Sequence, residues 1–146
     1  EAPTYTANDM IGTGAKITGG RWNNPGTPMV YTSVNIALAT LETLSYLRAG
    51  SLPFNRYLVR VDVPDEVWAR REELNPLPGG WDAIPSGLTS RKAGDDWIAS
   101  NRSPLLVVPS VIVPDEHNIL IHPAHPETAK LVATTVKRWV YDPRFF

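Results

Sequence analysis

The sequence predicts a mixed fold of the α+β class, in which a twisted and largely antiparallel sheet is flanked by a few helices. Fourteen prolines and ten glycines are spread along the 146 residues, which favours many short elements. Some segments alternate apolar and polar residues with a period of two, whereas others repeat apolar residues at helical spacing. Because 42% of the residues are hydrophobic, we expect residues 1–146 to form one compact domain with its own core.

A glycine-rich loop and a short strand are expected near the start of the chain. Residues 11–26 contain five glycines and two asparagines, a composition that favours irregular backbone. The apolar residues 29–31 follow as a short strand. The loop would therefore present the side chains of Arg21 and Trp22.

The first helix is expected over residues 34–48. Leu38 and Leu41 lie at helical spacing within this stretch. Thr32 and Ser33 precede it as candidate N-terminal caps, and Gly50 supplies a stop signal.

The middle of the chain is expected to form a strand, a long loop and a second helix. Residues 57–63 alternate apolar and polar side chains, as in a half-buried strand, and Pro64 ends it. The segment NPLPGGWDAIPSG, residues 75–87, is so rich in proline and glycine that a long loop or a lid over a site is expected. A helix over residues 90–100 follows.

The last third of the chain is predicted to consist mainly of strands. Two apolar runs are separated by Pro109 and Ser110, a pattern that favours a strand, a kink and a second strand. Two further strands follow before the chain turns into its tail. The four predicted strands span residues 105–108, 111–113, 119–121 and 131–140.

The composition excludes several kinds of site. Without cysteine, the chain has no disulfide, no thiol nucleophile and no thiolate zinc site. A net charge of −1 gives no broad basic surface for nucleic acid or for an anionic membrane. The apolar runs are far shorter than the ~20 residues of a membrane span, and no signal segment opens the chain. We therefore expect a cytoplasmic protein that binds neither membrane nor nucleic acid.

Arg21 and Tyr31 are the first candidate site residues. Both lie in GGRWNNPGTPMVYTS, residues 19–33, where glycines would let a ligand approach the backbone closely. A guanidinium suits a phosphate or a pyrophosphate, and a tyrosine ring can stack on a flat ring. A structural arginine in a turn, and a tyrosine packed in the core with its hydroxyl bonded, explain the same residues equally well.

Glu42 and Ser110 are the next candidates. Glu42 follows Leu41 directly and borders the apolar stripe of its helix, so its carboxylate needs a partner. That partner is either a core arginine such as Arg60 or the positive charge of a substrate in a cleft. Ser110 lies between two apolar runs without a G-x-S-x-G motif, which argues against a hydrolase nucleophile.

The three histidines do not predict a metal site. His117, His122 and His125 lie within nine residues, but their spacing matches no zincin helix and prolines interrupt the segment. Capped turns or structural hydrogen bonds are the expected roles, and we predict no metal.

Two segments of the chain resemble the RES domain, a family named for its arginine, glutamate and serine residues. GGRWNNPGTPMVYTS is similar to its G-R-W-(N)-x-x-G-x-P-x-V-Y motif, and ALATLE to its glutamate-bearing helix. The segment DDWIASNRSPLLVVPSVIVPDEHNILIHPAHP resembles its D-W, V-P-S and N-x-L-x-N-P-x-H-P stretch. The resemblance covers nearly the whole chain.

The resemblance implies a set of site residues. It places the family arginine, tyrosine, glutamate and serine at Arg21, Tyr31, Glu42 and Ser110. Asn118 and His125 fall on further family positions, whereas His122 stands where the family pattern has asparagine. Catalysis is then expected from Arg21, Tyr31 and Glu42, and contacts with NAD from Arg21, Tyr31, Ser110 and Asn118.

The resemblance also implies a fold, a reaction and partners. It implies a sheet similar to that of ADP-ribosyltransferase toxins, and the toxin of a bacterial toxin–antitoxin pair that consumes NAD as its substrate. The ADP-ribose would pass to a protein or, alternatively, to water or phosphate. A module that only binds nucleotide is a third possibility. The antitoxin would be an Xre-like helix-turn-helix protein, bound as a 2:2 or larger complex.

Overall fold

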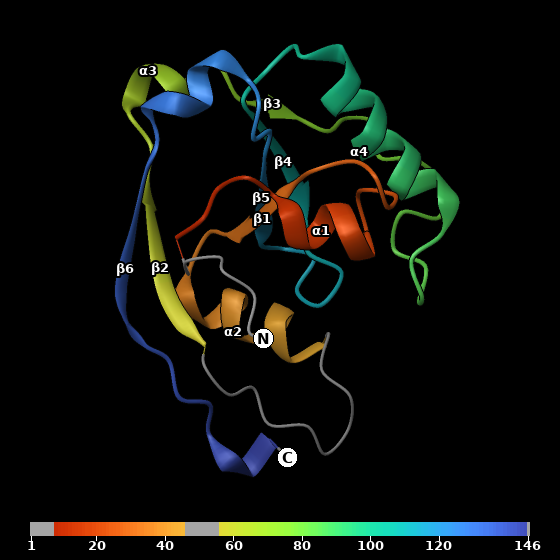
Figure 1. Ribbon diagram of the computed structural model, residues 1–146. Helices are drawn as coiled ribbons and strands as arrows, with labels where there is room; N and C mark the ends of the chain where they lie inside the picture. Colours follow the sequence, from red (N-terminus) through yellow and green to blue (C-terminus); the bar gives the residue numbers. More distant parts are fainter. Residues whose placement is uncertain (1–7, 46–55, 146) are drawn as a thin grey trace.

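The computed structural model describes residues 8–45 and 56–145 (Figure 1). Its helices and strands alternate along the chain, as a mixed α and β composition predicts. The α-helices are α1 (Thr13–Thr18), α2 (Ile36–Ser45), α3 (Asp65–Trp68) and α4 (Leu88–Ser100). The strands are β1 (Val30–Ser33), β2 (Tyr57–Asp62), β3 (Glu72–Glu73), β4 (Leu105–Pro109), β5 (His117–Ile121) and β6 (Val132–Arg138), and the 3₁₀ turns are η1 (Pro126–Lys130) and η2 (Pro143–Phe145).

The strands form two sheets and not one. The larger has the order β1-β5-β4-β3, with antiparallel pairing except for the short parallel contact between β3 and β4. The smaller pairs β2 with β6 in antiparallel fashion. The predicted mixed fold with largely antiparallel strands is therefore confirmed, with β2 and β6 set apart as a separate ribbon (Figure 1).

The larger sheet is buried on both faces. Leu106 and Val108 of β4 pack on one face with Trp22 and Trp97, in the cluster that α4 covers. Leu105 and Val107 belong to a second cluster, which includes residues of the β2–β6 side. Figure 1 accordingly shows α4 on one side of this sheet and the β2–β6 ribbon on the other. Burial on both faces explains why β4 is a continuous apolar run and does not alternate.

Helix α4 presses directly on the loop that contains Arg21. A Cβ added to Gly94 would lie 1.6 Å from the Trp22 carbonyl oxygen, so only glycine permits this approach. Asp95 accepts hydrogen bonds from both the backbone N–H and the side-chain amide of Asn24, at 3.1 Å and 2.8 Å. One turn of α4 thus fixes the backbone from Trp22 to Asn24.

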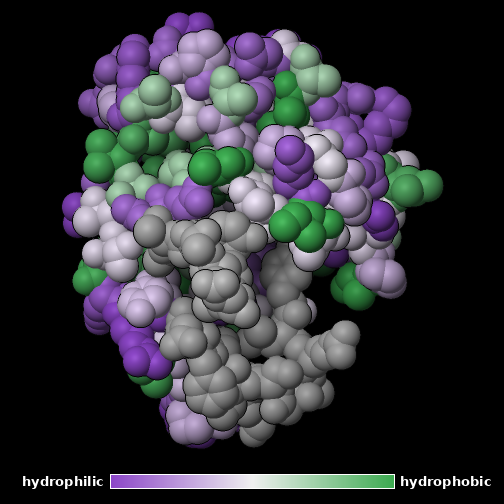
Figure 2. Space-filling model, viewed as in Figure 1, coloured by the Kyte–Doolittle hydropathy of each residue, from purple (hydrophilic) through white to green (hydrophobic). Residues whose placement is uncertain are grey.

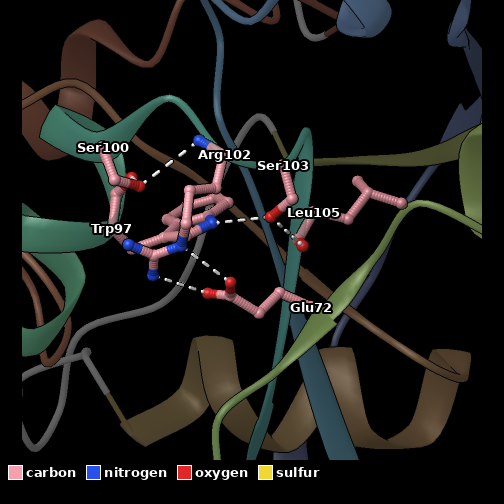
Figure 3. Close-up of polar contacts among 6 residues, drawn as sticks. All are labelled: Glu72, Trp97, Ser100, Arg102, Ser103 and Leu105. Atoms are coloured by element: carbon pink, nitrogen blue, oxygen red, sulfur yellow. Dashed lines mark hydrogen bonds and ion pairs between the residues drawn. The ribbon is translucent and has the colours of Figure 1, made fainter.

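The C-terminal end of α4 is tied to the sheet by polar contacts (Figure 3). The buried Trp97 donates its indole N–H to Ser103 at 2.9 Å, and the Ser103 hydroxyl donates to the Leu105 carbonyl at 3.1 Å. Arg102 makes two bonds of 3.0 Å to the Glu72 carboxylate, one to each oxygen. These contacts hold α4 against β3 and β4.

The surface carries scattered apolar side chains. In the view of Figure 2, hydrophobic residues form separate green patches between hydrophilic ones. Ile84 and Val140 are the most exposed large apolar residues of the described part, at 84% and 80%. Within residues 8–45 and 56–145, no helix is both long and apolar enough to cross a membrane.

Most predicted elements are confirmed, with shifted ends. The strands expected at 29–31, 57–63, 105–108, 119–121 and 131–140, the helix at 90–100 and the irregular loop at 75–87 are all present. The helix expected at 34–48 is confirmed as α2 up to Ser45, and its predicted stop at Gly50 lies outside the described residues. Helix α3 and the short strand β3 were not predicted.

The prediction of irregular backbone throughout residues 11–26 is wrong. Helix α1 forms inside this segment, between Gly12 and Gly19, which adopt φ angles of 79° and 74°. The glycines lie mainly at the ends of the helix, where left-handed backbone is needed, and Ala15 and Lys16 favour helix between them.

Two other local predictions are wrong because side chains take over backbone bonds. Residues 111–113 are not a strand, since the Ser110 hydroxyl accepts the N–H groups of Ile112 and Val113, both at 3.1 Å, and turns the chain. Helix α2 is capped by Asn35, whose side chain accepts the Leu38 N–H at 2.8 Å. Thr32 and Ser33 belong to β1 instead.

The buried histidines are structural, as expected. Nδ1 of His122 accepts the Ala124 N–H at 3.2 Å, and Nδ1 of His125 accepts the Glu127 N–H at 3.1 Å. Within the described parts of the chain, no three or more histidines, aspartates or glutamates are grouped so that they could hold a metal ion.

His122 should make the stability depend on pH. Burial and the neighbouring His125 lower the pKa of His122 from its ordinary value. The unfolded chain therefore takes up a proton near pH ~6.5 before the native protein does, so the free energy of unfolding falls as the pH drops below that value. His122→Asn keeps a side-chain acceptor and should flatten this slope by at most about 1.4 kcal/mol per pH unit. Urea unfolding at several pH values would measure the slope of the unfolding free energy against pH. Equal slopes in the unmodified protein and in His122→Asn would contradict the attribution of this pH dependence to His122.

Candidate active site

Several polar side chains meet at one end of the larger sheet. Ser33, the last residue of β1, lies opposite Asn118 near the start of β5. Asn118 also lies opposite Val108 of β4, two residues before Ser110. Helix α2 lies next to the loop that joins β4 and β5 (Figure 1). The strand register therefore brings Ser33, Asn118 and Ser110 together next to α2.

Glu42 of α2 is the centre of this group. Its Oε2 atom accepts a hydrogen bond of 2.9 Å from the Ser110 hydroxyl and one of 2.5 Å from the Asn118 amide. Ser33 in turn donates its hydroxyl to the Asn118 side-chain oxygen at 2.6 Å. The bonds from Ser110 and Asn118 end on the same oxygen of Glu42. The other oxygen, Oε1, has no hydrogen-bond partner among the described residues.

Ser110 has a defined positioning role in this network. Its hydroxyl oxygen is buried and accepts hydrogen bonds from two backbone N–H groups of the turn that follows. The same hydroxyl donates its hydrogen bond to Glu42. Because both lone pairs of this oxygen accept N–H groups of the turn, they are not free to attack a substrate, which argues against a nucleophile. Ser110 instead fixes the Glu42 carboxylate.

Arg21 anchors the 75–87 loop through one nitrogen. Its Nη1 donates to the carbonyl oxygens of Trp81 and Ala83, at 3.0 Å and 2.7 Å. The ring of Trp81 also stacks on Trp22, with 6.3 Å between ring centroids. The Nε and Nη2 donors of Arg21 have no partner among the residues described. They form the edge of the guanidinium that suits a phosphate.

Tyr31 and Asn23 organise the loop that presents Arg21. The Tyr31 hydroxyl donates to the Asn23 side-chain oxygen at 2.5 Å and accepts the Trp22 N–H at 3.1 Å. Asn23 is fully buried, and its amide donates to the carbonyl of Ala15 at 2.8 Å and to that of Thr27 at 3.0 Å. The glycine-rich loop is therefore a rigid structure held from inside.

Two cavities meet at Arg21 and Glu42. The larger has a volume of about 570 Å³ and is also lined by Arg91 and by residues 84–86 of the long loop. The smaller has a volume of about 160 Å³ and is lined by Tyr31, Asn118 and other residues near the sheet end. Both cavities include Val111 as well as the arginine and the carboxylate. The arrangement offers a cationic edge and a carboxylate at the junction of a large and a small compartment.

The structure brings all five predicted site residues to this place. Glu42, Ser110 and Asn118 are directly bonded, and Arg21 and Tyr31 line the smaller cavity with Glu42. Of the two partners considered for Glu42, the core arginine is wrong, because Arg60 is exposed and pairs with Asp62 at 3.2 Å. For Tyr31 the hydroxyl is bonded as in a core residue, while the ring faces the small cavity.

The sequence reasoning missed three residues of the site. Asn23 holds Tyr31, Ser33 holds Asn118, and Arg91 lines the larger cavity. The pair Asn23 and Asn24 beside Arg21 was a usable signal, since asparagines in a glycine-rich segment often bond their own backbone. Nothing in the sequence distinguishes Arg91 from other helix arginines.

Comparison with known proteins gives the family of the chain. The family model of the RES domain matches residues 1–143. The chain is 54% identical over 146 residues to a Sphingobium protein named "Prs ADP-ribosylating toxin", covering 99% of this chain and 91% of the relative. It is 35% identical to a "Toxin Res" of Photorhabdus laumondii and 32% identical to one of Yersinia enterocolitica, covering 92% and 96% of this chain and 85% and 92% of those proteins. The chain therefore belongs to the RES domain family.

Proposed function

We propose that the protein is a toxin that cleaves NAD at the bond between nicotinamide and ribose and transfers the ADP-ribose to a protein acceptor. The observation that carries this proposal is the Glu42 carboxylate, held by Ser110 and Asn118 at the junction of two cavities that share Arg21. An NAD site needs a cation for the pyrophosphate and a carboxylate near the ribose. It also needs a flat apolar surface for nicotinamide, which the Tyr31 ring provides in the smaller cavity.

The chemistry follows from the charges of the substrate. Nicotinamide in NAD is already cationic, so when its glycosidic bond breaks it takes the bonding electron pair and leaves as a neutral molecule. The ribose C1′ becomes an oxocarbenium-like cation, which the Glu42 carboxylate stabilises. The acceptor nucleophile then bonds to C1′ and releases its proton to water. Little general acid is needed, because the leaving group requires no proton.

Arg21 is suited to the pyrophosphate without giving up its structural role. Its Nη1 donates to the carbonyls of Trp81 and Ala83, and its opposite edge can donate two parallel hydrogen bonds to a phosphate. Binding would therefore leave the 75–87 loop in place above the substrate.

The acceptor is proposed from the relative. The Sphingobium protein is named for the ADP-ribosylation of Prs, and it matches 99% of this chain. We propose the Prs protein of the same cell as the acceptor. Water or phosphate as acceptor is the second candidate, since a carboxylate beside C1′ can serve those nucleophiles as well.

A labelling experiment separates these reactions. The purified protein is incubated with isotopically labelled NAD and a bacterial lysate, and the products are analysed by mass spectrometry. Labelled ADP-ribose on peptides of Prs supports transfer to protein. Label found only in free ADP-ribose or its phosphate supports NAD degradation, and intact NAD would contradict cleavage altogether.

The toxin is further proposed to act in the cytoplasm and to be neutralised there by an Xre-like helix-turn-helix antitoxin, as a 2:2 or larger complex. A carboxylate of an antitoxin segment that enters the larger cavity would compete for the phosphate edge of Arg21. Antitoxin and a non-hydrolysable NAD analogue should then exclude each other in calorimetry. Simultaneous binding at full affinity would contradict occlusion.

Ser110→Ala should reduce catalysis less than loss of the carboxylate itself. It removes one of the two hydrogen bonds to Glu42 Oε2 and leaves Asn118 in place. A hydrogen bond to a charged group contributes about 1.5–3 kcal/mol, so we expect kcat to fall about 10- to 100-fold with a smaller change in KM for NAD. Nicotinamide release in the steady state measures both.

Ser103→Ala is the matched control, since that buried serine lies in the core and bonds Trp97 and Leu105. Ser103→Ala should lower stability and leave kcat of the folded protein unchanged. A kcat for Ser110→Ala equal to that of the unmodified protein would contradict a positioning role.

A further inference from the structure

Arg91 lies in the larger cavity and is not explained by the packing of the fold. It is the fourth residue of α4, which begins at Leu88, and its side chain is partly buried and lines the cavity together with Arg21 and Glu42. A cation this close to a helix N-terminus is unfavourable with respect to the helix dipole. Helix stability therefore does not account for an arginine here.

The hydrogen bonds of Arg91 leave most of its donors available. Its Nη2 donates to the Ser86 carbonyl at 2.6 Å. Its Nε is buried and has no acceptor among the described residues. Its Nη1 also has no acceptor among these residues but is not one of the buried unpaired atoms, so it is the donor that an anion in the cavity can reach.

Ion pairing distinguishes Arg91 and Arg21 from most other arginines of the chain. Neither forms an ion pair with a carboxylate in the described part of the protein, whereas five other arginines do. Those five are Arg60, Arg70, Arg71, Arg102 and Arg144. The larger cavity thus contains two guanidinium groups against the single carboxylate of Glu42 among its lining residues. Its net charge is positive, as an anionic ligand requires.

Both arginines are held by the same loop. Arg21 donates to the carbonyls of Trp81 and Ala83, and Arg91 to that of Ser86. The loop of residues 75–87 thereby fixes two guanidinium groups at one wall of the cavity, and each keeps donors for a ligand. Two fixed cations match a diphosphate better than a single phosphate or a carboxylate.

We propose that Arg91 is a second binding residue for the diphosphate group of the dinucleotide, acting together with Arg21. The proposal rests on the proposed function, because it assigns the dinucleotide to this cavity. It gives Arg91 no part in breaking the glycosidic bond. Arg91 then determines affinity for the ADP part of the substrate, while Glu42 acts at the ribose.

The test uses ADP as the probe, because ADP contains the diphosphate and lacks the bond that is cleaved. Calorimetry compares the unmodified protein with Arg91→Gln and Arg91→Lys. Glutamine keeps a donor for the Ser86 carbonyl but removes the charge. Lysine keeps the charge but lacks the planar pair of guanidinium donors that can bind a phosphate in a bidentate manner. Lys92→Gln is the matched control, since Lys92 is the next residue, is exposed and pairs with Asp96 at 2.6 Å.

We expect Arg91→Gln to weaken ADP binding about 10- to 100-fold, Arg91→Lys to weaken it less, and Lys92→Gln to leave it unchanged. In steady-state cleavage of NAD, Arg91→Gln should raise KM by more than it lowers kcat. ADP affinity of Arg91→Gln equal to that of the unmodified protein would overturn the proposal. So would equal losses in the glutamine and lysine variants with lowered thermal stability, which indicate a structural arginine.

The outcomes separate this inference from the proposed function. If the unmodified protein cleaves NAD but its ADP affinity does not depend on Arg91, the inference fails and the reaction stands. If it binds ADP through Arg91 but leaves NAD intact, the assignment of Arg91 to a diphosphate stands and the proposed reaction fails.

Discussion

Glu42→Gln should lower kcat for NAD cleavage by about 10²- to 10³-fold, the range found when one group that stabilises transition-state charge is removed. The substitution is well matched to the site. Ser110 and Asn118 both donate to the same oxygen of Glu42, so a glutamine can place its carbonyl oxygen there and keep both bonds. Only the negative charge is lost. The oxocarbenium-like ribose then has no carboxylate beside it.

Affinity for ADP should change little in Glu42→Gln, because the diphosphate lies on the arginines. Glu116→Gln is the control: this glutamate accepts a bond of 3.0 Å from Asn35 and is not among the lining residues of the two cavities at Arg21. Its kcat should equal that of the unmodified protein. Near-normal cleavage by Glu42→Gln would remove the carboxylate from the mechanism.

Gly94→Ala should destabilise the protein by about 3 kcal/mol or more, at the upper end for overpacking in a core. Its Cβ would lie 1.6 Å from the Trp22 carbonyl oxygen and 3.1 Å from the Trp22 Cβ. The obstacle is backbone, so no side-chain rotation relieves it. Helix α4 must then move away from the loop that presents Arg21, and NAD affinity of the remaining folded protein should fall as well.

Gly14→Ala is the contrasting variant. Gly14 also lies in a helix, but a Cβ there would have nothing within 4 Å. Because alanine favours helix over glycine, this variant should gain up to about 1 kcal/mol. Urea unfolding of both variants gives the comparison. Unchanged stability of Gly94→Ala would contradict the account of how α4 positions the Arg21 loop.

The sequence predicts those parts of the fold that depend on local patterns. The alternation of residues 57–63 and the apolar run at 105–108 led directly to β2 and β4, and a helix was expected over residues 90–100, where α4 lies. The separation of β2 and β6 into their own sheet was not predictable, because it depends on which faces the long-range packing buries.

Two of the errors have a common cause, which is competition between side chains and backbone. Ser110 takes the N–H groups that a strand at 111–113 would need, and Asn35 caps α2 in place of the predicted residues. A sequence shows that serine and asparagine are able to do this, but not which backbone groups lie within their reach.

In the candidate site, too, some residues could be predicted from the sequence and others could not. Arg21, Tyr31, Glu42, Ser110 and Asn118 were predicted through the resemblance of their segments to the RES domain. Asn23 and Arg91 were not predicted, because the role of Asn23 depends on its burial beside Tyr31 and that of Arg91 on the cavity that it lines. The sequence also could not decide whether Glu42 pairs with Arg60 or faces a cleft. That depends on the register of β1, β5 and β4, which places Asn118 and Ser110 beside Glu42.

The most direct test of the account is a crystal structure of the protein with a non-hydrolysable NAD analogue. The account predicts the nicotinamide ring against Tyr31 in the smaller cavity, the ribose C1′ beside the Glu42 carboxylate, and the diphosphate on Arg21 and Arg91 in the larger cavity. An analogue bound elsewhere, for example in the cleft of about 760 Å³ lined by residues of both sheets, would contradict it. So would an analogue in these cavities with its ribose turned away from Glu42.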